Sequence, residues 1–148
     1  YFEATNIAAT IPTGNQLIGL EKASQFALDQ IFPVGNATLT CTANGNYYFN
    51  GSVLSGGPVY SAVGSTVGVA VDLGTGKVWL RTASGWNTGG DPSIGLNPIG
   101  TLTAGAMSGG VVPFVNSYSD SGSIRANFGN APFALGAVPA GFTPGWTQ

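Results

Sequence analysis

Hydrophobic and polar residues alternate along most of this chain, which is the spacing of β-strands that have one buried face. In residues 37–43 (ATLTCTA), Leu39 and Cys41 fall on one face. The other face carries only threonine: Thr38, Thr40 and Thr42. Asn44-Gly45 follows and predicts a type I′ turn, because that turn needs positive φ at both central residues. We therefore expect a hairpin whose return strand is residues 46–50, ending at a second Asn-Gly pair.

A second hairpin is predicted over residues 67–81. Its first strand places four aliphatic side chains on one face: Val67, Val69, Val71 and Leu73. Residues 77–81 (KVWLR) form the return strand, and residues 73–76 connect the two. Asp72 stands at the turn, where a carboxylate accepts hydrogen bonds from turn amides. This pattern favours a structural role for Asp72 and a core position for Trp79.

Three further segments complete the prediction. Residues 123–128 alternate as a late strand, and residues 111–115 form a short apolar strand in which Pro113 indicates an edge or a bulge. Residues 17–22 are expected to be a strand, and residues 23–32 a loop with at most a helical turn, because Pro33 stops a longer helix. We expect residues 1–148 to be a single all-β domain, a sandwich of short antiparallel strands, belonging to a longer chain.

Composition narrows the function classes. Charged residues make up only 7% of the chain, against 43% hydrophobic residues, and Ser, Thr, Asn and Gly take the polar positions. The four cations are dispersed, which gives nucleic acid no basic stripe. No run of 18 apolar residues is present, so no membrane insertion is expected. The low charge therefore favours a partner other than nucleic acid or a lipid bilayer.

Histidine is absent from the chain, which removes the commonest general base and the commonest zinc ligand. The single cysteine, Cys41, shares a strand face with Leu39 and has no cation nearby, so a buried structural thiol is expected. The six acids are scattered singly, without the local pair that would suggest a glycosidase. Neither an enzyme, nor a metal, nor any cofactor is expected.

The stretch GWNTGGDPSIGLN at residues 85–97 has the most varied chemistry in the chain. With one carboxylate it is a poor calcium loop, since calcium takes six to eight oxygen ligands. Its glycines and prolines predict a loop of defined conformation. Such a loop also suits ligand recognition, because sugars commonly pack on an aromatic face and bond to amides and carboxylates. Four candidate ligand-binding residues follow: Trp86, Asn87, Asp91 and Asn97. Packing as a core cap is the alternative for Trp86.

Tyrosines beside Gly/Ser-rich segments extend this candidate surface. Tyr60 and Tyr118 are predicted to lie at the rim of a binding surface built from loops. Trp146, near the end of the sequence, is expected to pack on the domain or on a neighbouring chain.

Several motifs, in order, resemble the SPRY domain, particularly its bacterial and phage-encoded branch. The stretch Gly90-Asp91-Pro92, with Gly95 and Asn97-Pro98, is similar to the GDPxxGxNP loop of microbial members. The other matching stretches are residues 1–3 (YFE), 17–20 (LIGL), 67–72 (VGVAVD), 77–79 (KVW), 127–129 (NFG), 132–133 (PF) and 139–142 (PAGF). The resemblance spans essentially the whole chain. It departs at residues 81–85, RTASG, where the family often has Lys-Asn-Gly.

The resemblance implies a bent sandwich of two antiparallel sheets that binds its partner through loops at one end. It implies a non-enzymatic module of a phage virion: a fibre, spike or surface decoration, located on the virion surface or outside the cell. The expected partners are a host-surface glycan or protein, or other virion subunits, and homo-oligomers are compatible with the sequence. A secreted or surface lectin-like module of a bacterium is the alternative.

Overall fold

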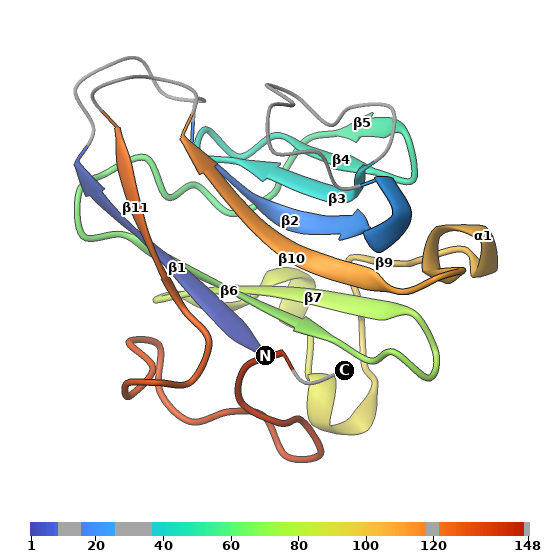
Figure 1. Ribbon diagram of the computed structural model, residues 1–148. Coiled ribbons are helices and arrows are strands. Elements are labelled where there is room, and N and C mark those ends of the chain that lie inside the picture. The colour runs from blue at the N-terminus through green and yellow to red at the C-terminus, as the bar shows by residue number, and fades with distance from the viewer. Residues whose placement is uncertain (9–15, 26–36, 118–121, 147–148) are drawn as a thin grey trace.

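Two antiparallel β-sheets pack face to face in this computed structural model, which describes residues 1–8, 16–25, 37–117 and 122–146 (Figure 1). The predicted all-β sandwich is confirmed. The strands are short because turns built on glycine and asparagine interrupt the alternating pattern every few residues.

Sheet A contains the first strand of the chain between two strands that come later in sequence. Its strand order is β11 (Ser123–Asn127), β1 (Phe2–Ala8), β6 (Thr66–Val71), β7 (Lys77–Thr82) and β8 (Gly85–Trp86). The short strand β9 (Gly100–Thr101) also pairs with β7. The predicted hairpin over residues 67–81 is confirmed as β6 and β7.

Sheet B has the order β10 (Val111–Ser117), β2 (Gln16–Lys22), β3 (Ala37–Thr42), β4 (Tyr47–Phe49) and β5 (Ser52–Leu54). Strand β10 lies at the edge of this sheet, as Pro113 predicts. Proline has no N–H to donate to a neighbouring strand, so it is tolerated where that side of the strand has no neighbour.

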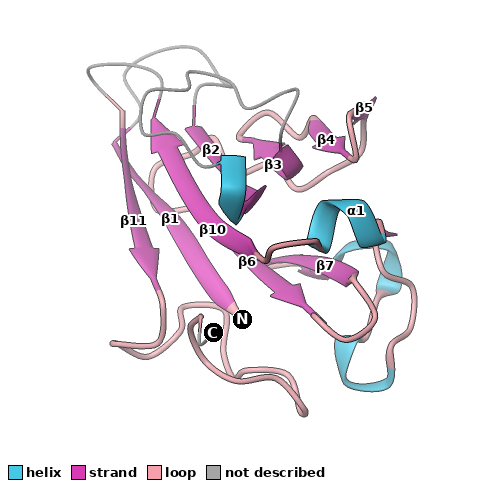
Figure 2. Ribbon diagram, turned by 45° about the vertical axis from the view of Figure 1, so that its right-hand side comes forward, coloured by secondary structure: helices cyan, strands magenta, loops and turns pink. Residues whose placement is uncertain are grey.

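Helices are few and short (Figure 2). They are the 3₁₀ turns η1 (Ala23–Gln25), η2 (Asn87–Gly89) and η3 (Pro92–Ile94) and the four-residue helix α1 (Ala104–Met107). The helical turn expected within residues 23–32 is η1; residues 26–32 lie outside the described part of the chain.

The main core fills the space between the two sheets. Val67, Val69 and Val71 of sheet A face it, as their alternation predicts. Sheet B contributes Ile18, Leu20, Leu39 and Cys41. Leu73, assigned to the same face, is 50% exposed instead, because the strand ends at Val71 and Leu73 lies in the turn.

The outer faces of both sheets are also partly buried, which the alternating pattern did not predict. Thr40 and Thr42, on the expected polar face of β3, are 1% and 5% exposed. On sheet A the ring of Tyr1 lies over Gly68, where a Cβ would come within 2.3 Å of the Tyr1 hydroxyl oxygen. These three positions therefore lie in the interior and not on the solvent surface.

The two Asn-Gly pairs form different turns. At Asn44-Gly45 only the glycine has positive φ, 88°, and Gly45 N donates to Thr42 O. This is a three-residue loop with glycine at its left-handed position, so the predicted type I′ turn is wrong here. At Asn50-Gly51 both residues have positive φ, 49° and 82°, and the pair joins β4 directly to β5. The type I′ geometry belongs to this second pair.

A segment of irregular backbone, residues 128–146, covers the outer face of sheet A and is called the tail below (Figure 1). Its Phe133, Val138 and Phe142 pack on a second apolar cluster of Tyr1, Ala70 and Trp79. The buried carboxylate of Glu3 holds the tail by accepting from the amides of Ala134 and Leu135. The tail thus makes a third layer beneath the sandwich.

Candidate functional site

A cleft of about 550 Å³ opens where three segments distant in sequence meet. They are the β6–β7 turn, the loop that contains η3, and the end of the tail. Its volume lies within the range of roughly 300–1,000 Å³ typical of small-ligand sites. The lining side chains that matter most below are Asp72, Lys77, Ser93, Phe142 and Trp146.

The β6–β7 turn fixes Asp72 at one side of the cleft. Its Oδ1 accepts hydrogen bonds from the amides of Gly74 and Thr75, at 2.8 and 3.3 Å, and its Oδ2 accepts from the Thr75 hydroxyl at 2.6 Å. These bonds, the hydroxyl bond above all, lower the pKa of the Asp72 carboxyl below its usual value. The predicted structural role of Asp72 is confirmed, and the carboxylate is held ionised in one place.

Lys77 begins the return strand and also lines the cleft. Its Nζ donates to the carbonyl oxygen of Gly95 at 3.3 Å, which links the hairpin to the η3 loop. Among the described residues that line the cleft, the charged side chains are therefore Asp72, an anion, and Lys77, a cation.

The η3 loop is shaped by its own residues. Asp91 caps η3, because its Oδ1 accepts from the backbone N and the hydroxyl of Ser93 at 2.9 and 2.6 Å. Gly95 ends the turn with φ of 70°, a conformation that glycine adopts without strain. The backbone of Leu96 accepts the indole N–H of Trp79 at 2.7 Å. The loop is thus bonded to the sheet beneath it.

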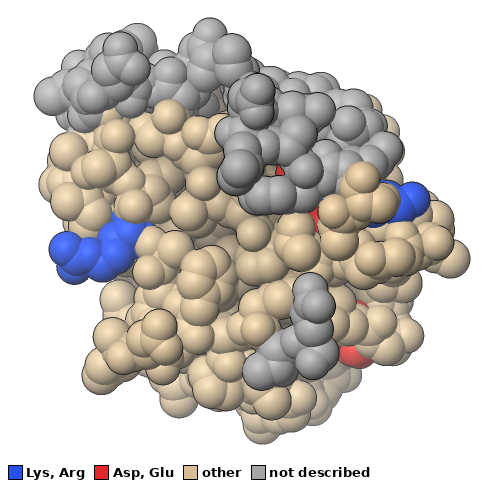
Figure 3. Space-filling model, viewed as in Figure 1, with Lys and Arg blue, Asp and Glu red and all other residues tan. Residues whose placement is uncertain are grey.

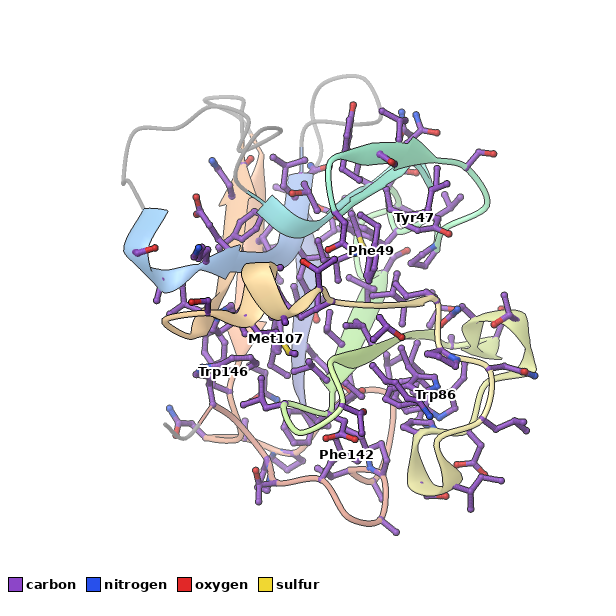
Figure 4. The ribbon with its side chains drawn as sticks, turned by 90° about the vertical axis from the view of Figure 1, so that its right-hand side faces the viewer. Tyr47, Phe49, Trp86, Met107, Phe142 and Trp146 are labelled. Carbon is purple, nitrogen blue, oxygen red and sulfur yellow. The ribbon has the colours of Figure 1, made fainter. Side chains whose placement is uncertain are left out.

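The tail closes the third side. Tyr1 N donates to Thr143 O at 2.9 Å, and Gly145 N donates to Tyr1 O at 2.8 Å. Phe142 contacts Trp79 edge to face, with ring centroids 6.0 Å apart. Trp146 packs edge to face on Phe2 at 6.3 Å, which confirms packing on this domain. Figure 4 shows Phe142 and Trp146 in the lower half of the molecule, away from Tyr47 and Phe49 of sheet B.

Trp86, one of the predicted ligand contacts, is half-buried and already has ring partners. The Arg81 guanidinium carbon lies 5.4 Å from its ring centroid, and Tyr1 contacts it edge to face at 6.1 Å. Trp86 packs on the second cluster and does not line the cleft. The fully buried Trp79, 1% exposed, confirms the core position predicted for it.

The polar residues predicted from the same stretch make bonds within the fold. Asn87 Oδ1 accepts the amide of Leu80 at 2.7 Å, and Asn97 Nδ2 donates to Thr88 O at 3.5 Å. Together with the Asp91 cap, these contacts confirm the loop of defined conformation. Its surface toward the cleft consists of Pro92, Ser93 and Gly95 instead, residues that were not predicted to contact a ligand.

Tyr60 is not a surface residue, and its assignment to the binding surface is wrong. It is 1% exposed, and its hydroxyl lies 2.8 Å from the carbonyl oxygens of both Gln16 and Cys41, which share its one proton. Both carbonyl groups lie far from the buried phenol in sequence. Tyr118, the other candidate, lies outside the described residues.

Cys41 is fully buried in the main core, which confirms the structural thiol. Burial raises its pKa, so the thiolate is disfavoured. Among the described residues, no group of three or more acids or cysteines could hold a metal ion. Within the same ranges, no helix has the length and apolar character needed to cross a membrane.

Among the residues that the structure describes, Asp72 is the only carboxylate that lines the cleft. Lys77 and Trp146, which the sequence reading treated as a strand end and a packing residue, join it there because the hairpin and the tail converge. No family model matches the chain, and no curated protein shows significant sequence similarity to it. The cleft is therefore interpreted from its own chemistry.

Proposed function

We propose that this chain is a non-enzymatic recognition module and that the cleft between the β6–β7 turn, the η3 loop and the tail receives its ligand. The observation that carries the proposal is the convergence of three distant segments on one concave surface, lined by aromatic and polar groups. Sites of this composition are typical of small-ligand binding.

The single carboxylate supports a binding role. Most glycoside hydrolases flank the scissile bond with two carboxyl groups, and within the described ranges Asp72 alone supplies a carboxylate to this cleft. Turn hydrogen bonds also keep Asp72 ionised, so near neutral pH it carries no proton to donate as a general acid.

The resemblance to microbial SPRY domains supports a place in a phage virion, where the module would contact a host-surface glycan or protein, or neighbouring subunits. The low charge agrees with this: among the described residues drawn in Figure 3, charged side chains form only small, separate areas. A secreted lectin-like module of a bacterium would use the same cleft.

A blocked cleft tests the proposal. Ala140 is exposed and lines the cleft, so Ala140→Trp fills it; Ala62, equally exposed and not among the lining residues, gives the matched control Ala62→Trp. The purified parent chain is expected to bind bacterial envelope fractions, Ala140→Trp to bind at least tenfold less, and Ala62→Trp to bind like the parent. Circular dichroism checks that all three are folded. Absence of binding by the parent overturns the recognition role and leaves assembly with other subunits as the alternative.

A further inference from the structure

Asp72 and Lys77 place a hydrogen-bond acceptor and a donor on the same cleft, and no hydrogen bond joins these two side chains. Their hydrogen bonds go to the turn and to Gly95, respectively, and not to each other. A carboxylate offers about four acceptor sites, of which the turn uses three, and an ammonium offers three donors, of which Gly95 takes one. One acceptor and two donors therefore remain for a ligand.

The sum of these two charges is zero. An anionic ligand such as a phosphate or sulfate group would meet the fixed Asp72 carboxylate beside the one lysine, and a cationic ligand would meet Lys77. A neutral group that both donates and accepts hydrogen bonds suits the pair. A hydroxyl has this property, since it has one donor and two acceptor lone pairs.

The rest of the cleft combines aromatic and aliphatic side chains and backbone with the hydroxyl groups of Tyr1, Ser93 and Thr143. Phe142 and Trp146 supply half-buried aromatic rings, and Leu73 stands half-exposed at the rim. Gly141, with φ of 84° and no atom within 4 Å of where a Cβ would stand, contributes backbone without a side chain and so lets a ligand approach the wall closely. Aromatic rings beside fixed polar groups form a surface that suits a molecule with an apolar face and a hydroxylated edge.

A pyranose ring has both features: C–H groups on its face and hydroxyl groups around its edge. Resting on the recognition role proposed above, we infer that the ligand of this cleft is a neutral saccharide. Two neighbouring hydroxyl groups bond to Asp72 and Lys77, and the ring face packs on the tail aromatics. The candidate surface around Trp86 and Asp91 is not needed for this contact, because those groups already bond within the fold.

The test uses methyl glycosides of glucose, mannose, galactose and N-acetylglucosamine, with heparan sulfate as the anionic comparison. Saturation-transfer NMR detects contact, and a titration followed by tryptophan fluorescence gives the affinity. At least one neutral glycoside is expected to bind, and heparan sulfate is expected not to compete with it. Ala140→Trp should abolish the signal.

Lys77→Met removes the donor and keeps the length of the side chain; Lys22→Met, at the end of β2 and outside the cleft, is its matched control. Lys77→Met is expected to weaken binding about tenfold to a hundredfold, the usual effect of losing a hydrogen bond from a charged group. Lys22→Met should stay within twofold of the parent.

The failure of this inference differs from failure of the recognition role. If none of the four glycosides gives saturation transfer, or if Lys77→Met binds as the parent does, the saccharide assignment is overturned. Envelope binding that Ala140→Trp still blocks would then leave the cleft as a site for a protein ligand. Absence of envelope binding by the parent rejects the recognition role itself.

Discussion

The carboxylate of Glu3 accepts the backbone amide of Ala134 at 2.7 Å across 131 positions of sequence. It also accepts from Leu135 at 3.1 Å and from the hydroxyl of Tyr1 at 2.7 Å. Glu3 is 1% exposed, so these three donors replace the water that a carboxylate would otherwise bind. This buried group joins the first strand to the tail that forms one side of the cleft.

Glu3→Gln is expected to lower the free energy of unfolding by about 1–3 kcal/mol. The NH₂ group that replaces one carboxylate oxygen cannot accept the hydrogen bond donated to that position. Urea denaturation measures the change, and amide hydrogen exchange at Ala134 and Leu135 should accelerate. Unchanged exchange at these two amides would show that the tail is held by its apolar contacts alone.

Glu21 makes the stability of the fold depend on pH. It is 3% exposed on β2, its Oε1 accepts no hydrogen bond from the described part of the chain, and burial raises its pKa. A raised pKa in the folded state means that the native protein binds this proton more tightly than the unfolded chain does. Its contribution to stability is therefore full below the unfolded pKa and is lost as the pH rises through the folded pKa.

Glu21→Gln should accordingly be more stable than the parent near neutral pH, by about 1 kcal/mol. The difference should close as the pH falls below the usual glutamate range. Thermal or urea unfolding at several pH values between about 3 and 7 measures it. A difference that is the same at every pH would mean that the substitution acts through packing and not through ionisation.

Gly68 is required by the ring of Tyr1. A Cβ at this position would lie 2.3 Å from the Tyr1 hydroxyl oxygen and within 3 Å of two ring carbons. Gly68→Ala is expected to destabilise the domain by about 1–3 kcal/mol, the usual cost of overpacking. Gly105→Ala, in helix α1 where the nearest atom would be 3.9 Å away, is the matched control and should be neutral or slightly stabilising. Equal effects of the two substitutions in denaturation experiments would refute the steric explanation.

Asn50 holds positive φ in the type I′ turn between β4 and β5. Asn50→Ala is expected to cost about 1–2 kcal/mol, because the Cβ of an ordinary residue is disfavoured in the left-handed region. Asn50→Gly keeps the conformation accessible and should cost less, although it also removes the side-chain bond to Thr101 O. If the two variants prove equally destabilised, the hydrogen bond and not the backbone conformation determines the effect.

Local sequence patterns predicted those features of the fold that depend on residues close together in the sequence. The β6–β7 hairpin, the edge position of β10 and the Asp72 turn follow from alternation, from proline and from a carboxylate beside glycines. The prediction for Tyr60 is wrong because it rests on the Gly/Ser-rich segments beside this residue, whereas its partners Gln16 and Cys41 lie 44 and 19 positions away. No local signal reports such partners.

The same distinction between local patterns and distant contacts explains why only part of the site was predicted. The importance of residues 85–98 to the fold could be inferred from their turn chemistry, and so could the cap made by Asp91. Which side of that loop faces a cleft depends on where the tail crosses sheet A. That position is fixed by Glu3 and by the bonds between Tyr1 and residues 143–145, which no periodicity records.

The position of β1 between two strands that follow it in sequence has a consequence for how the protein is made. This strand lies between β6 and β11, which follow it by roughly 60 and 120 residues. The amide of Ala134, which donates to Glu3 of this strand, comes later in the sequence than both. During synthesis the first strand leaves the ribosome long before any of its partners exist. Because such distant pairings fold slowly, on a scale of about milliseconds to seconds, sheet A is assembled only after most of the domain has been translated. Until β6 and β11 have been synthesised, β1 is thus an unpaired strand that could pair with the wrong segment.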